Sequence, residues 1–250
     1  MNTRSVRVVG ALMIAGAVLA NVGFILLGSR FNYPAVLDEP AGNILRTFQG
    51  GAAPIRALFV VLATASALLI PIAWFGRDLI ARSGIRRLMV FAGIAAGLVQ
   101  VAGLLRWPLL VPHLADVATN STTTAAARAD AIDTFKTLHT YLGGLVGEAF
   151  GYALTATWTT AMVVGVVRRP GRWFAPLGGA SAVLIATGLL EPLGVPGAGF
   201  TNFLGYIAWS IWMVAFGVSL LRHAALATAS SGSSGARLPA VNVSASGARI

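Results

Sequence analysis

The sequence predicts an all-α membrane protein, a polytopic bundle of six transmembrane helices with both termini on the cytoplasmic side. Of its 250 residues, 56% are hydrophobic and only 10% are charged, whereas a soluble domain has about 25% charged residues. The mean hydropathy is +0.78, and apolar runs of about 20 residues, the length that crosses a bilayer, recur along the chain. These observations exclude an ordinary cytosolic enzyme, a disordered chain and a collagen-like chain.

Six apolar runs are long enough to span the membrane. They cover residues 8–28, 57–76, 88–105, 139–167, 173–190 and 202–221. The first run resembles a signal peptide, but it continues to Leu27, which favours an uncleaved span. We therefore expect a transmembrane domain over residues 1–224. The tail at 225–250, which is rich in Ser, Gly and Ala, is expected to be disordered and cytoplasmic.

Basic residues predict the orientation of the bundle. The formal net charge is +10, and short cytoplasmic loops of membrane proteins collect Arg and Lys. This distribution favours a bacterial inner membrane protein whose partners are membrane lipids, argues against nucleic-acid binding, and leaves the oligomeric state open. With both termini inside, 12 arginines lie inside (4, 7, 77, 82, 86, 87, 168, 169, 172, 222, 237 and 248) and five basic residues outside (Arg30, Arg46, Arg56, Arg128 and Lys136).

Two long segments, 29–56 and 106–138, join the predicted spans on the outer side. The first contains three apolar residues at helical spacing, which predicts a short helix lying at the outer membrane interface (Ile44, Leu45 and Phe48). The second has a polar Thr-rich stretch followed by a predicted helix over 125–138 with a charged, solvated face.

Ionisable groups on four predicted spans lie at one depth. Arg56, Arg106, Glu148 and Glu191 are each 19 to 21 residues from an arginine at the inner end of the same span. At about 1.5 Å per residue, they lie about 28–32 Å above the inner boundary. Asn202 is at a similar depth, so we expect a polar layer beneath the two outer segments.

Glu148 is the member of this layer that most requires a partner. The apolar, glycine-rich pattern runs through it without a break, and Tyr141, Glu148 and Thr155, which are seven residues apart, share a face of the predicted helix. Small residues flanking an acid indicate a close helix contact with the acid inside it. An ionised carboxylate there needs a partner, for which Arg106 is the first candidate and Arg56 the second.

Arg106 and Glu191 have a simpler alternative interpretation, in which they mark the points where helices leave lipid. A weak internal repeat bears on both residues, because Arg87–Arg106 aligns without gaps on Arg172–Glu191 with six identical positions of 20. Composition bias also produces such matches. If the repeat is a true duplication, Arg106 and Glu191 face each other across a pseudo-axis along the membrane normal.

Three functional hypotheses remain open. The first is an outward-facing polar pocket that binds a small molecule or lipid, as in a transporter accessory or sensor, formed by Arg56, Arg106, Tyr141, Glu148, Glu191 and Asn202. The second is an enzyme at the outer face that uses His113, His139 and nearby carboxylates. The third is a structural role with no ligand. Without cysteine and without nucleotide-binding or hydrolase motifs, the sequence leads us to expect no metal and no cofactor, and it does not identify a catalytic residue.

Three motifs carry a resemblance to a known family. The segments FNYPAVLDEP, GLLRWPLLVPHLA and HTYLGGLVGEAFGY resemble those of small six-span bacterial membrane proteins grouped as a family of unknown function. The resemblance covers roughly residues 7–221. It implies an integral membrane protein and assigns no reaction and no catalytic residue.

Overall fold

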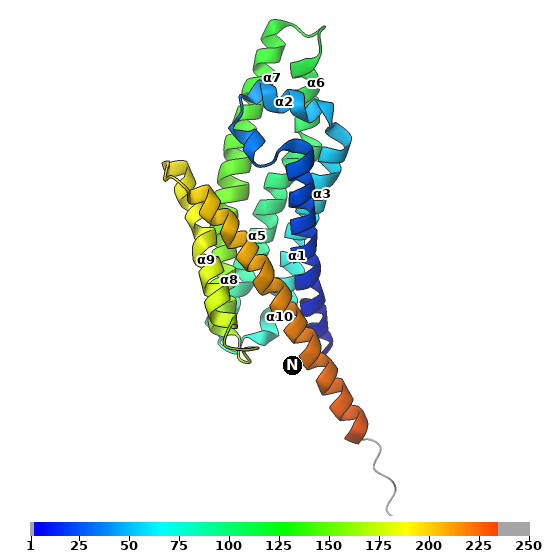
Figure 1. Cartoon of the computed structure of the whole chain (residues 1–250), viewed down its shortest axis with the longest axis vertical. Helices are drawn as coiled ribbons and strands as arrows, with labels where there is room; N and C mark the ends of the chain where they lie inside the picture. The colour runs from blue at the N-terminus through cyan, green and yellow to red at the C-terminus, as the bar shows by residue number, and fades with distance from the viewer. Residues whose placement is uncertain (1–2, 235–250) are drawn as a thin grey trace, which may run out of the picture.

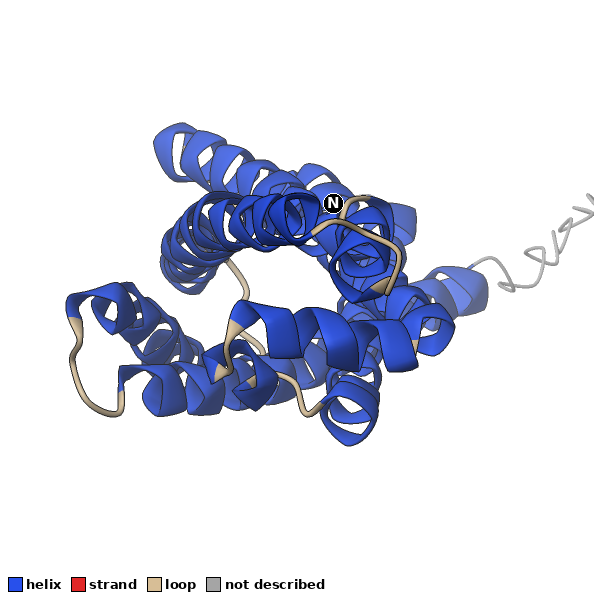
Figure 2. Cartoon of the chain, turned by 90° about the horizontal axis from the view of Figure 1, so that it is seen from above, coloured by secondary structure: helices blue, strands red, loops and turns tan. Residues whose placement is uncertain are grey.

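The structure, a computed structural model, describes residues 3–234, which form helices, turns and loops without a β-strand (Figure 2). Most of the helices run along one long axis (Figure 1). Their bounds are α1 Thr3–Phe31, η1 Ala35–Asp38, α2 Ala41–Gly50, α3 Ala52–Ala67, α4 Leu69–Gly76, η2 Arg77–Leu79, α5 Ser83–Leu109, α6 Val111–Thr119, α7 Ala125–Leu138, η3 His139–Phe150, α8 Gly151–Gly165, α9 Phe174–Ala186, η4 Thr187–Leu193 and α10 Ala198–Ser234.

Five helical stretches within the described residues are long and apolar enough to cross a membrane. They are Thr3–Phe31, Ala52–Leu79, Ser83–Thr119, Phe174–Leu193 and Ala198–Leu226, and they overlap five of the six predicted spans. The chain is therefore a multi-pass helical membrane protein. The remaining predicted span, 139–167, is formed by η3 and α8 and is not one of the five.

The long helices form a closed ring in chain order. Each packs on the next: α1 on α3 and α4, these on α5, then α8, α9 and α10, and α10 packs back on α1. Where α10 meets α1, a Cβ on Gly217 would lie 2.6 Å from the carbonyl oxygen of Gly10. The absence of side chains there allows this close backbone contact, as is usual between membrane helices.

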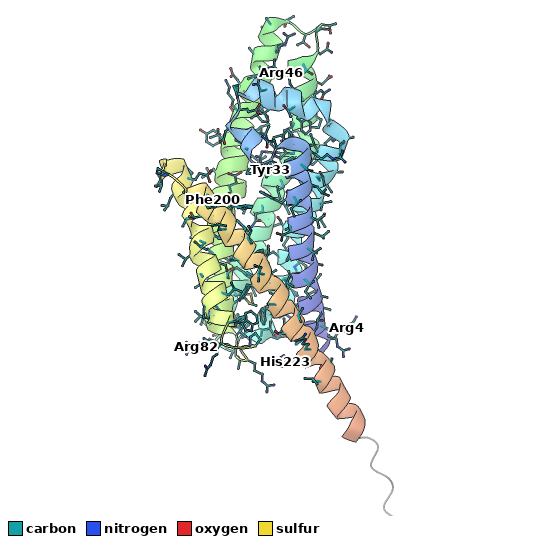
Figure 3. The ribbon with its side chains drawn as sticks, in the orientation of Figure 1. Arg4, Tyr33, Arg46, Arg82, Phe200 and His223 are labelled. Carbon is teal, nitrogen blue, oxygen red and sulfur yellow. The ribbon has the colours of Figure 1, made fainter. Side chains whose placement is uncertain are left out.

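Two apolar cores fill the two ends of this ring. At the end capped by α2, α6 and α7, here called the hairpin end (Figure 1), Trp107 stacks on Phe59 at 4.7 Å and meets Phe31, Phe48 and Phe135. The opposite end, here called the arginine end, has a separate core that includes Met13, Trp158, Phe174, Trp212 and Phe216. Figure 3 shows Arg46 at the hairpin end and Arg4 and Arg82 at the arginine end.

Helix α2 forms where the spacing predicts a helix, but its apolar face contacts protein. Ile44, Leu45 and Phe48 are at most 2% exposed, because α2 packs against α6 and α7 and adds these side chains to the core of the hairpin end. The expectation that this face lies against the lipid interface is therefore corrected.

Helix α10 extends into the segment that we expected to be disordered. Residues 225–234 are helical, whereas the composition predicts a disordered tail from 225. The physical reason is that the run from Ala224 is rich in Ala, which favours a helix, and contains neither glycine nor proline before Gly232. Residues 235–250 of the expected tail lie outside the described range.

Candidate functional site

The candidate site is built on η3, a π-helix that continues into α8. π-Helical geometry is rare and often occurs at functional sites. Because a π-helix has roughly 4.4 residues per turn, positions seven apart lie on opposite faces, whereas in an α-helix they share one. Tyr141 is accordingly 63% exposed, while Glu148 faces a pocket within the bundle. The expectation that the two side chains share a face is corrected for this reason.

Glycines on η3 allow a close contact with α5. Gly143 and Gly147 of η3 and Gly151 at the start of α8 are spaced four residues apart, and a Cβ on Gly103 of α5 would lie 2.6 Å from the Cα of Gly147. A Cβ on Gly143 would lie 2.5 Å from Nη2 of Arg106. The expected close helix contact is present, but the glycines form it and Glu148 points elsewhere.

Arg106 is buried without a direct counter-ion. Its side chain is 4% exposed. The Nη1 atom donates a hydrogen bond to the carbonyl of Gly103, and Nη2 lies 3.5 Å from Nδ1 of His139. The Nε atom has no hydrogen-bond partner among the described residues. Arg106 and Glu148 interact electrostatically, but no direct ion pair joins them in the described part of the chain. The expected pairing is therefore at longer range than a salt bridge.

Tyr33, for which the sequence pattern gave no indication, interacts electrostatically with Arg106 and Glu148. It follows α1 at the hairpin end (Figure 3), and its ring meets Phe24 at 5.6 Å and Phe59 at 5.5 Å. Burial, and then the negative charge of Glu148, raise the pKa of the Tyr33 phenol above its ordinary value. The hydroxyl therefore stays protonated at neutral pH and can donate a hydrogen bond.

A pocket of about 170 Å³ opens between η3, α8 and η4. Two carboxylates line it, Glu148 from η3 and Glu191 from η4, and they interact electrostatically. Glu148 makes neither a hydrogen bond nor a direct ion pair with any other described residue, so its charge is compensated only at a distance. The pocket lining contains no basic side chain within residues 3–234 (Gly144, Glu148, Ala149, Tyr152, Gly188, Glu191 and Pro192).

The second carboxylate of the pocket lies at the start of α10. A Cβ on Gly199 would be 3.0 Å from Oε1 of Glu191, so this glycine makes room for the acid. The positive end of the α10 dipole favours an ionised carboxylate at this place. Glu191 is exposed. The helix dipole of α10 compensates part of its charge, whereas the charge of Glu148 is compensated only at a distance.

Asn202 stabilises the junction of helices from which part of the pocket lining projects. It is 6% exposed and its Nδ2 donates a 2.6 Å hydrogen bond to the carbonyl of Ile185, near the end of α9. A Cβ on Gly188 would lie 2.5 Å from both Nδ2 of Asn202 and Cδ2 of Tyr152. Asn202 therefore fixes the junction between α9 and η4, from which Gly188 and Glu191 reach the pocket.

The other predicted members of the layer lie elsewhere. Arg56 is exposed on α3 and does not line the pocket. Arg106 lies against Gly143 whereas Glu191 lies against Gly199, so the structure does not place these two charges opposite each other. Of the predicted set, it brings together Glu148, Glu191 and Asn202, with Arg106 nearby.

A chain of polar side chains links the pocket region to the middle of the bundle. Gln100 donates a 2.9 Å hydrogen bond to Thr155 and lies 3.4 Å from Ser66. Tyr206 lies beside Thr155, and its ring is 5.9 Å from that of Tyr152. The sequence feature that indicates this polar network is Gln100, a single amide within an apolar span.

The histidines proposed for an enzyme are apart. His113 and Asp116 are exposed on α6, whereas His139 stacks on Phe135 and contacts Arg106. Among the described residues, no group of three or more His, Cys, Asp or Glu side chains is arranged to hold a metal ion.

Comparison with known proteins gives one match. A family model described as "Domain of unknown function (DUF4386)" matches residues 8–229. No curated protein and no solved structure matches the chain.

Proposed function

The chain belongs to this family of unknown function, and from its geometry we propose that it binds a small molecule or a lipid through a cationic group, in the pocket between Glu148 and Glu191. One observation carries the proposal. Glu148 is a carboxylate inside a helical membrane protein, it faces a pocket, and it makes no direct ion pair within residues 3–234. Such a group needs a proton or a cation as partner.

Volume and charge define the ligand group. A pocket of about 170 Å³ is smaller than the roughly 300–1,000 Å³ of sites for drug-sized ligands. Two carboxylates favour positive charge, and Tyr152 adds an aromatic ring to the lining, which attracts ammonium groups. The proposed group is therefore a primary or quaternary amine, either free or as the head group of a lipid.

The proposed placement in the membrane has six spans, with η3 and α8 as the fourth and both termini inside. Two observations support a fourth span. Helix α7, which precedes η3, lies at the hairpin end, and Val166, which follows α8, pairs with Ile80 at the arginine end. The segment formed by η3 and α8 therefore runs the length of the bundle. The positive-inside rule then puts the arginine end in the cytoplasm of a bacterial cell and the pocket toward the outside.

Thermal unfolding of the purified full chain with ethanolamine, choline or phosphatidylethanolamine tests the pocket. A ligand at 100 times its Kd stabilises the folded state by about 2.7 kcal/mol, so we expect a rise in Tm for the natural protein and none for Glu148→Gln. A response to the free amines identifies a small-molecule site, and a response to the lipid alone identifies a lipid site.

Asp130→Asn is the matched control, because Asp130 is an exposed carboxylate on α7. Its Tm should rise as in the natural protein. Equal responses of Glu148→Gln and the natural protein, or no response to any amine, would contradict the proposal. Without ligand, Glu148→Gln should unfold at the same or a higher temperature, because an under-compensated charge is removed from a low-dielectric site. A lower Tm would support the purely structural alternative.

A further inference from the structure

Two loops at the arginine end are joined into one surface. Ile80 and Val166 form an antiparallel bridge, and the amide of Val167 donates a 3.2 Å hydrogen bond to the carbonyl of Leu79. Leu79, Ile80 and Val166 are at most 6% exposed, and a Cβ on Gly165 would lie 2.8 Å from Ile80. The α4–α5 and α8–α9 connections are therefore held together by buried anchors.

Arginines are concentrated in the two connections that this junction joins. Apart from Asp78, which lies 3.9 Å from Arg77, the two connections carry no acidic residue within 77–87 and 166–173. Seven arginines lie in these segments, five of them exposed (Arg82, Arg87, Arg168, Arg169 and Arg172) and two partly exposed (Arg77 and Arg86). We call these seven residues the arginine surface.

Apolar side chains border the arginine surface along the sides of the bundle. Val167 is 64% exposed and Phe75 43%, and Trp74 is 51% exposed with the guanidinium of Arg77 4.3 Å from its ring centre. A tryptophan at the end of a membrane helix marks the level of the lipid head groups. The arginines are therefore at head-group level, next to surface that faces acyl chains.

From this juxtaposition we infer that the arginine surface binds the phosphate groups of an anionic phospholipid, whose acyl chains extend along the bundle from the level of Trp74 and Phe75. Guanidinium groups bind phosphate in a bidentate manner, and basic sites between membrane helices bind lipids with two phosphates, such as cardiolipin. The bordering apolar residues favour a lipid over a soluble anion or a nucleic acid, because neither of those would use them.

Native mass spectrometry of the purified full chain in detergent tests this site with cardiolipin, phosphatidylglycerol and phosphatidylcholine. We expect affinity to fall in that order. In the triple variant Arg82→Gln/Arg168→Gln/Arg172→Gln, the affinity for cardiolipin should fall at least about fivefold. The matched control is Arg46→Gln/Arg56→Gln/Arg128→Gln, which removes the same charge at the hairpin end and should bind cardiolipin as the natural protein does.

Three results would overturn the inference: equal affinity for cardiolipin and phosphatidylcholine, equal losses in both triple variants, or full competition by inorganic phosphate, which would indicate a site for a soluble anion. The Tm of each variant without added lipid shows whether it is folded. If the first triple variant is unfolded, Arg168→Lys/Arg172→Lys replaces it. This variant keeps the charge but loses bidentate geometry, and it should bind cardiolipin more weakly than the natural protein.

Discussion

Gly143 shows at the scale of one residue why the contact between η3 and α5 depends on glycine. The guanidinium of Arg106 occupies the space where a Cβ on Gly143 would lie, at 2.5 Å from Nη2. Gly143, which has no side chain, therefore lies directly against the large side chain of Arg106. An arginine can be buried at this place because the neighbouring helix offers it room.

Gly143→Ala should lower stability, because the added methyl group overlaps the guanidinium of Arg106, which is 4% exposed and would have to shift. Overpacking of this kind costs about 1–3 kcal/mol, measurable as a fall in Tm or in the SDS fraction at the unfolding midpoint. Gly179→Ala is the control, since no heavy atom lies within 4 Å of its added Cβ, and alanine favours a helix. Equal effects of the two substitutions would show that Gly143 is not a close contact.

The sequence predicted some of these residues and missed others. A glycine-rich pattern around an acid was enough to predict the close helix contact, although the acid itself, Glu148, points elsewhere. Which face each residue takes was not predictable, because the assumption of 3.6 residues per turn fails in η3. Tyr33 and Tyr152 were missed because nothing in the local pattern of either segment shows which distant residues it meets in the folded chain.

At the scale of the helix pair, a hydrogen bond joins α5 to α8. Gln100 of α5 donates to Thr155 of α8 at 2.9 Å, close to the place where Gly151 contacts the Gln100 side chain. Polar bonds of this type help to fix the register of membrane helices, although each contributes only modestly to stability. The bond therefore supports the position of η3, the next segment toward the pocket.

A double-mutant cycle on Gln100→Leu and Thr155→Val should give a coupling energy of about 0.5–1.7 kcal/mol, the range measured for hydrogen bonds between membrane helices. The control cycle pairs Gln100→Leu with Thr157→Val, because Thr157 bonds the carbonyl of Ala153 on its own helix at 2.7 Å. That cycle should be additive. Equal coupling in the two cycles would mean that the bond does not connect the helices.

The whole molecule is a ring of helices in which the two ends differ in charge. The arginine end carries the paired loops, and the hairpin end carries α2, α6 and α7 with most of the acids. This asymmetry is the physical basis of the proposed orientation, since loops rich in arginine are retained on the cytoplasmic side.

Cysteine labelling tests both the orientation and the number of spans, because the natural sequence contains no cysteine and each introduced thiol is unique. On intact cells, a membrane-impermeant maleimide should label Thr122→Cys, whereas Ala81→Cys and Gly171→Cys should react only after the cells are permeabilised. Labelling of Gly171→Cys on intact cells together with Thr122→Cys would show that η3 and α8 do not cross. The reverse pattern at all three positions would invert the orientation.

Composition and hydropathy determined by themselves that the chain is a multi-pass helical protein, because the length of an apolar run and the excess of nonpolar residues are properties of the sequence alone. Depth along each span also follows from counting residues, which is how Arg106, Glu148, Glu191 and Asn202 were selected. Only the tertiary structure decided which of these side chains meet. The direction in which a side chain points depends on the rotation of its helix. The π-helical geometry of η3 and the packing of α9 on α10 set that rotation through contacts between residues far apart in the sequence.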